Sequence, residues 1–284
     1  MDLSTLFVWS VVVGGLALGL LLSARRRQRR WLGEVRLARG RVGPEHPVVL
    51  LHGLFGFDEL EIGGSRHQYF RGLTQQLENL GVDVHRPRLA RVASIETRAQ
   101  QLVHTIEGLS AKRVNLIAHS MGGLDARYAL THLGLADRVA SLITISAPHR
   151  GTPLADLGRR LRATPGLAGA LRRAGIDLQA FQDITTEGTL AFNQSVPNAD
   201  GVWYASVVGR ASGSALNPLL WASHRYLRAR AGENDGVVPV SSQVWGEVIA
   251  EVEADHWAQV GWSAHFDAAE LFSLLLHELR DRGL

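Results

Sequence analysis

The sequence predicts an α/β fold, with a mostly parallel β-sheet flanked by helices. Apolar runs of strand length, such as Val114 to Ala118 and Val139 to Ser146, alternate with segments whose apolar residues recur at helical spacing. Strands that are apolar without interruption are typical of a parallel sheet, because such a sheet is buried on both faces. The 284 residues are sufficient for one large core or two small ones.

The first half of the chain follows this alternation closely. Its predicted elements are a strand at 47–51, a helix at 69–80, a strand at 82–86, a helix at 95–109, a strand at 114–118 and a helix at 124–133. Gly81 is expected to cap the first helix, and Pro87 to end the second strand. Strands separated by helices favour parallel pairing, because parallel neighbours need a crossover connection.

The second half contains a helical insertion within the same alternation. Its expected elements are strands at 139–146 and 202–208, an irregular excursion at 212–230, a turn-rich loop at 232–239 and an amphipathic helix at 266–279. Residues 153–197 are amphipathic and show no strand pattern. Ligands of open α/β sheets bind at the carboxyl ends of the strands. We expect this insertion to cover that edge, as a lid over a binding pocket or as a rigid helical cap.

Residues 6–22 carry no charge, and we interpret them as an uncleaved membrane anchor. As a helix they would be roughly 25 Å long at ~1.5 Å per residue, which is just enough for a bilayer core. Asp2 precedes them and five arginines follow between Arg25 and Arg30, the reverse of a cleavable signal peptide. The positive-inside rule then places the rest of the chain in the cytoplasm, with 1–30 as anchor and 31–45 as linker. An exported protein with a signal peptide, or a buried helix, is the alternative.

The charge distribution argues against a nucleic-acid surface. The net charge of +3 depends on the arginines after the apolar segment, and the residues beyond position 30 carry 25 basic and 26 acidic side chains. A nucleic-acid-binding domain would carry a basic excess on the domain itself. The absence of cysteine excludes disulfides, thiolate metal sites and a cysteine nucleophile.

The segment from Arg113 to Gly123, RVNLIAHSMGG, has the pattern of a nucleophile elbow around Ser120. In this motif a buried strand turns sharply through a serine into a helix, which lifts the hydroxyl above the end of the sheet. The usual pattern is G-x-S-x-G, and Ala118 stands at its first position. Alanine is a mild substitution where strand and helix cross closely. A serine in an ordinary turn is the alternative.

A serine hydroxyl needs a base to accept its proton, and the base needs an acid to fix its tautomer. In this fold the chain order is serine, acid, histidine. Asp235 lies in the Gly-flanked loop after a core strand, and His256 follows it, so these two residues are the candidate acid and base.

Other titratable residues compete for these roles. His265 is the rival base, and the rival acids are Asp183, Asp200 and Asp255. Asp255 adjoins His256, so its side chain should point elsewhere. His52 and His119 precede the serine and are expected to form local hydrogen bonds.

The first strand ends in His52-Gly53-Leu54-Phe55-Gly56, where glycines let the backbone approach a ligand closely. This is the position at which an α/β-hydrolase supplies half of its oxyanion hole. We expect the backbone N–H groups of Leu54 and Met121 to donate to the oxyanion. A tight turn alone explains the two glycines equally well.

Five motifs in order resemble the bacterial triacylglycerol lipases of the Pseudomonas and Burkholderia type. They are VVLLHGLFGFD, VNLIAHSMGGLDARY, ITISAPHRGTP, TTEGTLAFN and NDGVVPVSS. The resemblance covers about residues 46 to 280. It implies an α/β-hydrolase domain over 46–284 with a cap at about 153–197, hydrolysis of carboxylic esters, and Ser120, Asp235 and His256 at the family's catalytic positions.

Two features depart from that family. Its structural calcium is held by an aspartate two residues after the catalytic histidine and another about twenty before the catalytic aspartate. Here the first position is Ala258, and no aspartate occurs between Gly201 and Asn234. Calcium requires such oxygen ligands, so the sequence predicts no calcium and no other cofactor or metal.

The second departure is the anchor at residues 6–22, where a secreted lipase has a signal peptide. The expected protein is therefore a serine hydrolase in the bacterial inner membrane, acting on acyl esters such as lipids and with no nucleic-acid partner. An acyltransferase, thioesterase or polyester depolymerase would use the same three residues. A membrane-anchored binding protein without turnover is the remote alternative.

Overall fold

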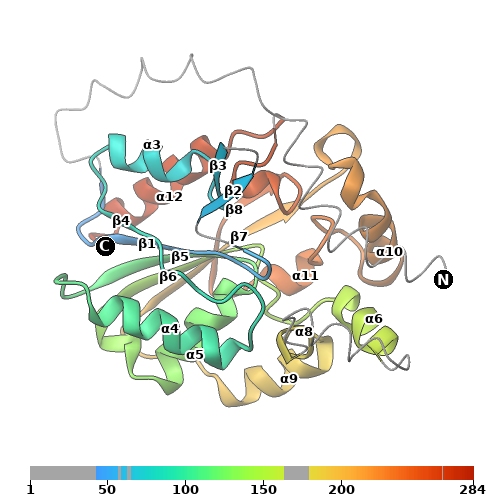
Figure 1. Ribbon diagram of the computed structural model, residues 1–284, viewed down its shortest axis with the longest axis horizontal. Coiled ribbons are helices and arrows are strands. Elements are labelled where there is room, and N and C mark those ends of the chain that lie inside the picture. The colour runs from blue at the N-terminus through green and yellow to red at the C-terminus, as the bar shows by residue number, and fades with distance from the viewer. Residues whose placement is uncertain (1–42, 57–58, 63–64, 163–178, 264) are drawn as a thin grey trace.

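The computed structural model describes residues 43–284 apart from 57–58, 63–64, 163–178 and 264 (Figure 1). The predicted anchor at 1–30 and most of the linker at 31–45 lie outside these residues. Among the described helices, none has the length and apolar character needed to cross a bilayer.

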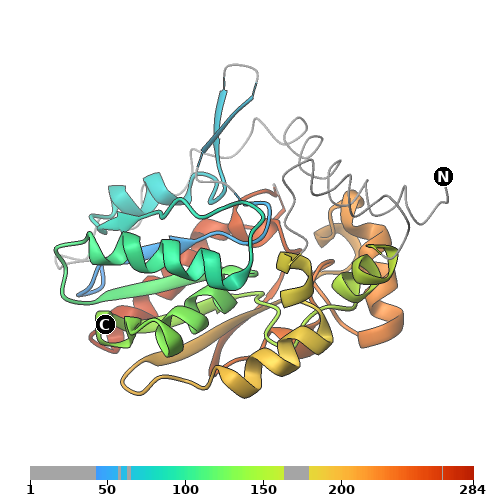
Figure 2. The same ribbon diagram turned by 60° about the horizontal axis from the view of Figure 1, so that its bottom comes forward.

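A parallel sheet forms the centre of the described chain. Its strands, in spatial order, are β4 (Val84–His85), β1 (Val48–Leu51), β5 (Val114–His119), β6 (Val139–Ile145), β7 (Trp203–Arg210) and β8 (Glu247–Glu253). Each neighbouring pair is parallel, as the alternating pattern predicts. A separate antiparallel hairpin, β2 (Glu59–Ile62) and β3 (Ser65–Gln68), projects from the sheet in Figure 2 and was not expected from the sequence.

The helices cover both faces of the sheet and the end that carries the insertion. They are α3 (Leu73–Asn79), α4 (Ile95–Glu107), α5 (Gly122–His132), α6 (Pro153–Arg162), α8 (Gln179–Asp183), α9 (Thr186–Ser195), α10 (Trp221–Ala231), α11 (Val240–Gln243) and α12 (Ala268–Asp281). The short 3₁₀ turns are η3 (Leu135–Arg138), η4 (Gly213–Ala215), η5 (Pro218–Leu220) and η6 (Ala258–Val260). In Figure 1, α3 and α12 lie on one side of the sheet, and α4 and α5 lie on the other.

The alternation of side chains along each strand builds two cores. Val48 and Leu50 of β1 pack with the apolar residues of α3 and α12. Val49 and Leu51 of the same strand point the opposite way and pack with α4 and α5. All four side chains are buried, which explains why the strands read as unbroken apolar runs.

Two predicted boundaries differ from the structure. The helix expected at 69–80 begins only at Leu73, because Gly72 adopts a left-handed φ of 73° directly before it. The prediction of an irregular excursion at 212–230 was wrong from Trp221 onward, because α10 occupies Trp221–Ala231. This helix buries little apolar surface. Aromatic–arginine pairs at i,i+4 support it instead, with Arg230 over Tyr226 at 3.8 Å and Arg225 over Trp221 at 5.6 Å.

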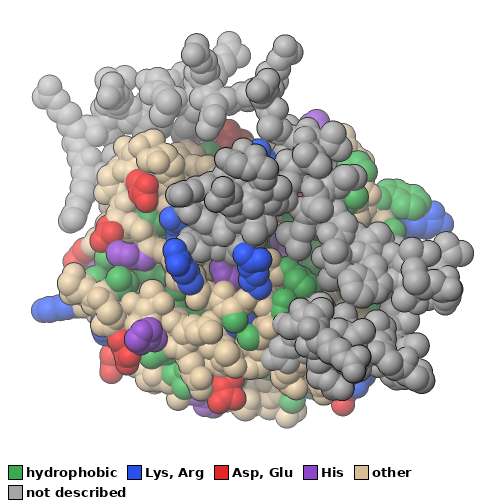
Figure 3. Space-filling model, in the orientation of Figure 1, with side chains coloured by type: hydrophobic (Ala, Val, Ile, Leu, Met, Phe, Trp, Pro, Cys, Tyr) green, Lys and Arg blue, Asp and Glu red, His purple; other side chains and the backbone are tan. Residues whose placement is uncertain are grey.

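The helices α6, α8 and α9 lie between β6 and β7 and contain the described part of the predicted insertion. They cluster with α10 at one end of the sheet in both ribbon views (Figures 1 and 2). Hydrogen bonds join them to one another, since both carboxylate oxygens of Asp156 accept from Thr186. On the face shown in Figure 3, acidic and basic side chains are interspersed.

Candidate active site

Ser120 stands between β5 and α5 in a strained turn, as the elbow pattern predicts. Its φ is 57°, in the left-handed region that costs a residue with a side chain about 1–3 kcal/mol. Gly122 explains how α5 can start so close to β1. A Cβ at this glycine would lie 3.0 Å from the carbonyl oxygens of both Leu51 and His52.

A second serine, Ser146, adopts a similar conformation at the end of the neighbouring strand β6, with φ 48°. Its side chain is fully buried, and its hydroxyl is engaged by Gln243 and Gln259. Ser120 retains 8% exposure. Of these two strained serines, therefore, only Ser120 retains contact with solvent.

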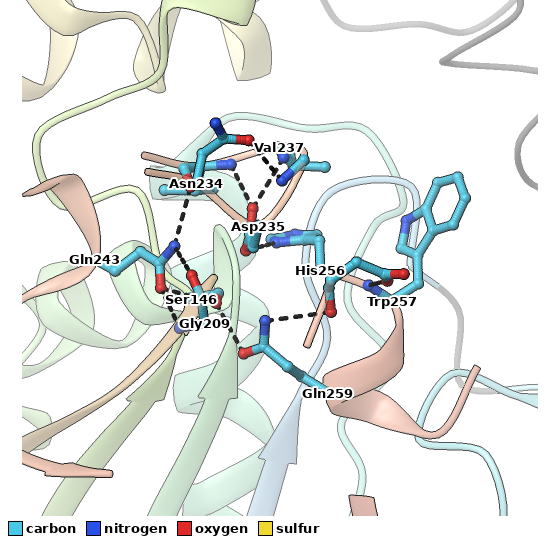
Figure 4. Close-up of polar contacts among 12 residues, drawn as sticks. Ser146, Gly209, Asn234, Asp235, Val237, Gln243, His256, Trp257 and Gln259 are labelled. Carbon is cyan, nitrogen blue, oxygen red and sulfur yellow. Dashed lines mark hydrogen bonds and ion pairs between the residues drawn. The ribbon is translucent and has the colours of Figure 1, made fainter. Parts of the chain in front are cut away.

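Asp235 and His256 form a short buried contact in which Nδ1 of the imidazole donates to Oδ2 of the carboxylate over 2.7 Å (Figure 4). The other carboxylate oxygen accepts from the amides of Val237 and Val238 at 2.9 and 2.7 Å. The backbone N–H of His256 also donates to the Asp235 carbonyl. Because Asp235 occupies Nδ1, the Nε2 atom of His256 remains available to a reacting group.

The rival residues have other partners. Oδ1 of Asp255 accepts from the amides of Trp257 and Ala258, and Oδ2 accepts from the amide of Asn217, so this carboxylate points away from the imidazole as expected. Asp183 accepts from the amide of Ile95 at the start of α4. Asp200 and His265 lie exposed on the surface.

The elbow and the histidine loop meet through His119, the residue directly before Ser120. Its ring centroid is 4.4 Å from that of His256. Among the hydrogen bonds of the described residues, none joins the Ser120 hydroxyl to the imidazole. Catalytic hydrogen bonds are often long in ligand-free enzymes and tighten only when substrate binds. The structure thus brings the three predicted residues to one edge of the sheet, with the acid–base bond already formed.

The loop after β1 approaches Ser120 closely because its second residue is glycine. A Cβ at Gly53 would lie 2.7 Å from the Ser120 Cβ and 3.1 Å from Oγ. The described residues provide no hydrogen-bond acceptor for the backbone N–H groups of Leu54 and Met121. Two unpaired donors beside a serine match the arrangement of an oxyanion hole.

His52 forms a local hydrogen bond, as expected, whereas the partner of His119 lies 50 positions away in the sequence. His52 Nδ1 contacts the Gly53 carbonyl at 2.9 Å, and His119 Nδ1 contacts the Tyr69 hydroxyl at 2.7 Å. Burial lowers the pKa of His52 to about 4 and that of His119 well below its ordinary value. Both imidazoles are therefore neutral near pH 7.

A buried arginine that the sequence analysis missed supports the loop after β1. Arg98 on α4 donates to Asp125 on α5 at 2.7 Å, to the His52 carbonyl at 2.6 Å and to the Ala90 carbonyl. Burial raises the pKa of Asp125 to about 7, against the lowering effect of Arg98. No local motif marks these residues, because the pair joins two helices that are far apart in sequence. A charged residue at an apolar position of the predicted helix 95–109 was the only available signal.

The described cap packs directly on the same loop. Phe55, whose φ is 57°, contacts Phe181 of α8 with ring centroids 5.7 Å apart. The contact between Asp183 and Ile95 fixes the end of α8 to α4. An aromatic contact therefore joins the loop to the cap, and Leu54 packs in the same apolar cluster as Ala180 of α8.

Groups of three or more His, Cys, Asp or Glu side chains able to hold a metal are absent from the described residues.

Comparisons with known proteins match this chain over most of its length. Residues 93–164 match the family model of the PGAP1-like alpha/beta domain. The triacylglycerol lipase of Pseudomonas fragi is 31% identical over 296 residues, covering 86% of this chain and 99% of the relative. The triacylglycerol lipase of Vibrio cholerae is 32% identical and covers 72% of this chain and 76% of the relative.

Solved structures share the fold. The mature Bacillus licheniformis lipase BlEst2 superposes with a TM-score of 0.66 at 21% identity, covering 86% of this chain and 95% of that structure. The metagenomic carboxyl esterase MGS0156 gives a TM-score of 0.71 at 18% identity, with coverage of 97% and 91%.

Proposed function

The chain belongs to the triacylglycerol lipase family of α/β-hydrolases, and on that premise we propose that it hydrolyses carboxylic acyl esters through an acyl-serine intermediate. Ser120 is the nucleophile, His256 the general base and Asp235 the acid that orients it. The observation that carries the proposal is the buried Asp235–His256 hydrogen bond of 2.7 Å beside the strained Ser120 turn.

In the acylation step, Ser120 Oγ attacks the ester carbonyl carbon while Nε2 of His256 accepts the hydroxyl proton. The carbonyl oxygen becomes an oxyanion, which the N–H groups of Leu54 and Met121 stabilise. A single such donor is worth about 2.7–4 kcal/mol in measured cases. The tetrahedral intermediate then expels the alkoxide, which takes the proton from His256 and leaves as the alcohol.

In the deacylation step, a water molecule attacks the acyl-serine carbonyl and gives one proton to His256. Collapse of the second tetrahedral intermediate returns that proton to Ser120 Oγ and releases the carboxylic acid. Asp235 holds the Nδ1–H tautomer throughout and stabilises the imidazolium that forms in each step.

The cap suggests an apolar acyl group as the preferred substrate. Phe55 of the loop after β1 and Phe181 of α8 are in aromatic contact, and apolar surface of this kind binds hydrocarbon by the hydrophobic effect. We propose that the insertion at 153–197 forms the acyl-chain pocket or lid of the enzyme.

We also propose that residues 6–22 anchor the enzyme in the inner membrane, with the hydrolase domain in the cytoplasm. Support comes from the uncharged segment and the arginines that follow it. Protease treatment of sealed inverted vesicles tests this topology. Digestion of the domain is expected, and its protection would contradict the proposed orientation.

The direct test of function compares wild type with Ser120→Ala and His256→Ala on short nitrophenyl esters and with a fluorophosphonate probe. Ser120→Ala should lose both hydrolysis and labelling. The matched control is His265→Ala, which removes an exposed histidine and should retain activity. Hydrolysis by Ser120→Ala at the wild-type rate would remove the proposed nucleophile.

Product analysis separates hydrolysis from acyl transfer, because both reactions use the same acyl-serine. Free fatty acid should remain the main product when glycerol or another alcohol is added. A new ester as the main product would instead identify an acyltransferase.

A further inference from the structure

A layer of buried polar side chains lies beneath Asp235 and His256, where the ends of β6 and β7 meet two loops (Figure 4). Ser146, Gln243 and Gln259 form this layer, and all three side chains are fully buried. Neither glutamine touches solvent, so neither can contact a substrate. The proposed acylation and deacylation steps do not involve this layer.

Gln243 makes every hydrogen bond that an amide side chain can make. Its Nε2 donates to the carbonyls of Gly209 and Val238 at 2.9 and 3.0 Å. Its Oε1 accepts from the Gly209 amide at 2.7 Å and from the Ser146 hydroxyl at 3.0 Å. Val238 is the residue whose amide donates to the Asp235 carboxylate at 2.7 Å. Gln243 therefore fixes the backbone that holds the acid.

Gln259 acts in the same way on the histidine loop. Its Nε2 donates to the carbonyls of Ala254 and Asp255 at 3.4 and 3.3 Å, and its Oε1 accepts from the Ser146 hydroxyl at 2.8 Å. The Asp255 carbonyl belongs to the peptide group that joins Asp255 to His256. Gln259 therefore fixes the backbone from which the imidazole extends.

Ser146 joins the two glutamines. Its single hydroxyl proton is shared between both Oε1 atoms, at 3.0 and 2.8 Å, as a three-centre hydrogen bond. The left-handed φ of 48° turns this serine into the layer at the end of β6. Gly209 makes room for the arrangement, since a Cβ there would lie 2.1 Å from Nε2 of Gln259.

We propose that Gln243 and Gln259, coupled through Ser146, are positioning residues that set the placement of Asp235 relative to His256. The inference rests on the proposed function for its kinetic consequence, but its structural consequence can be measured without turnover. Hydrogen bonds within this network connect the loop of the acid, the loop of the base and the two strands between them. A shift in either loop would lengthen the 2.7 Å contact between carboxylate and imidazole.

The test replaces Ser146 with alanine, which removes the shared hydroxyl and little volume. The matched control is Ser141→Ala in the same strand β6. Ser141 is also fully buried and donates to an amide oxygen, that of Asn115 at 2.7 Å, but it lies at the amino end of the strand. Both variants lose one buried hydroxyl–amide bond, so their thermal stabilities should fall by similar amounts.

Two readouts distinguish positioning from a purely structural role. The first is the low-field proton resonance of the Asp235–His256 hydrogen bond, which should shift or broaden in Ser146→Ala and stay unchanged in Ser141→Ala. The second is ester hydrolysis, where Ser146→Ala should lower kcat on the order of tenfold with little change in KM, since small misplacements of catalytic groups carry large rate penalties. Ser141→Ala should keep the wild-type kcat.

A second variant, Gln259→Met, covers the case in which Ser146→Ala fails to fold. It keeps the length of the side chain and should show the same shift in resonance and the same loss of kcat. Combined with Ser146→Ala, it should lower kcat by less than the product of the two single effects, because both act through one network. An unchanged resonance and kcat in a folded variant would overturn the proposal. A shifted resonance in an enzyme without esterase activity would retain the positioning role and reject the proposed function.

Discussion

Arg98 and Asp125 form a fully buried ion pair of 2.7 Å that joins α4 to the helix behind Ser120. The same guanidinium donates to the His52 carbonyl, at the start of the loop that carries Leu54. One side chain thus connects the proposed oxyanion loop to the helix of the elbow.

Replacing Arg98 with methionine should weaken both the fold and catalysis. Loss of one partner leaves Asp125 buried without compensation, which typically costs about 3–5 kcal/mol of unfolding free energy. The loop that carries Leu54 would also lose its hydrogen bond from Arg98. The kcat for hydrolysis of a nitrophenyl ester should therefore fall. Arg159→Met is the control. It breaks an exposed pair with Glu187, worth about 0–1 kcal/mol, and should leave kcat unchanged. Equal losses of stability in the two variants would contradict the prediction.

The pH dependence of stability should contain a contribution from Asp125. Burial raises its pKa from 3.8 to about 7, so the folded protein holds this proton more tightly than the unfolded chain. Such a group contributes stability at low pH, and that contribution is lost as pH rises from about 4 to about 7. Asp125→Asn does not titrate. Urea unfolding should show wild type losing stability relative to the variant as pH rises from about 4 to about 7, and a constant difference would argue against the raised pKa.

Gly53→Ala should inactivate the enzyme without unfolding it. The added Cβ would lie 2.7 Å from the Ser120 Cβ and 3.1 Å from the Tyr69 hydroxyl, so the loop must move away from the serine. Loss of oxyanion stabilisation lowers kcat on the order of a hundredfold or more. Gly158→Ala on α6 is the control, because nothing lies within 4 Å of its added Cβ. It should keep full activity, and equal activity of the two variants would exclude the proposed loop geometry.

Activity should not depend on calcium. The lipases that this sequence resembles hold calcium with two aspartates. Here alanine stands at the first of these positions, Ala258, and no aspartate occurs between Gly201 and Asn234. The carboxylate of Asp255 ties the histidine loop to Asn217 through hydrogen bonds instead. Treatment with EDTA should leave the rate of ester hydrolysis and the melting temperature unchanged. If EDTA lowered the rate or the melting temperature, and calcium but not magnesium restored it, the prediction would be wrong.

The sheet and the elbow could be predicted because a strand buried on both faces consists of consecutive apolar residues, which are visible in the sequence. Strands β1, β5, β6 and β7 are apolar runs, and the turn at Ser120 follows one of them directly. Each strand, and the turn at Ser120, can be recognised from adjacent residues alone, without knowledge of contacts between distant parts of the chain. The candidate acid Asp235 was likewise chosen from a Gly-flanked loop that lies within a few residues of it, and its catalytic role stays a prediction.

The supporting side chains could not be predicted, because their roles arise only from long-range pairing. Arg98, Gln243 and Gln259 are ordinary polar residues in sequence, and each becomes informative only when its buried partners are known. Helix α10 was missed for a related reason. Its arginines resemble a solvated loop until the i,i+4 aromatic contacts are seen.

The hydrogen bond between Ser146 and Gln259 spans 113 positions of the chain, and this spacing has a consequence for biosynthesis. Ser120 and its strand leave the ribosome long before β8 and the residues that carry the base. Under the proposed mechanism, a nascent chain therefore displays the serine early but cannot activate it until the loop that carries His256 has been made and packed.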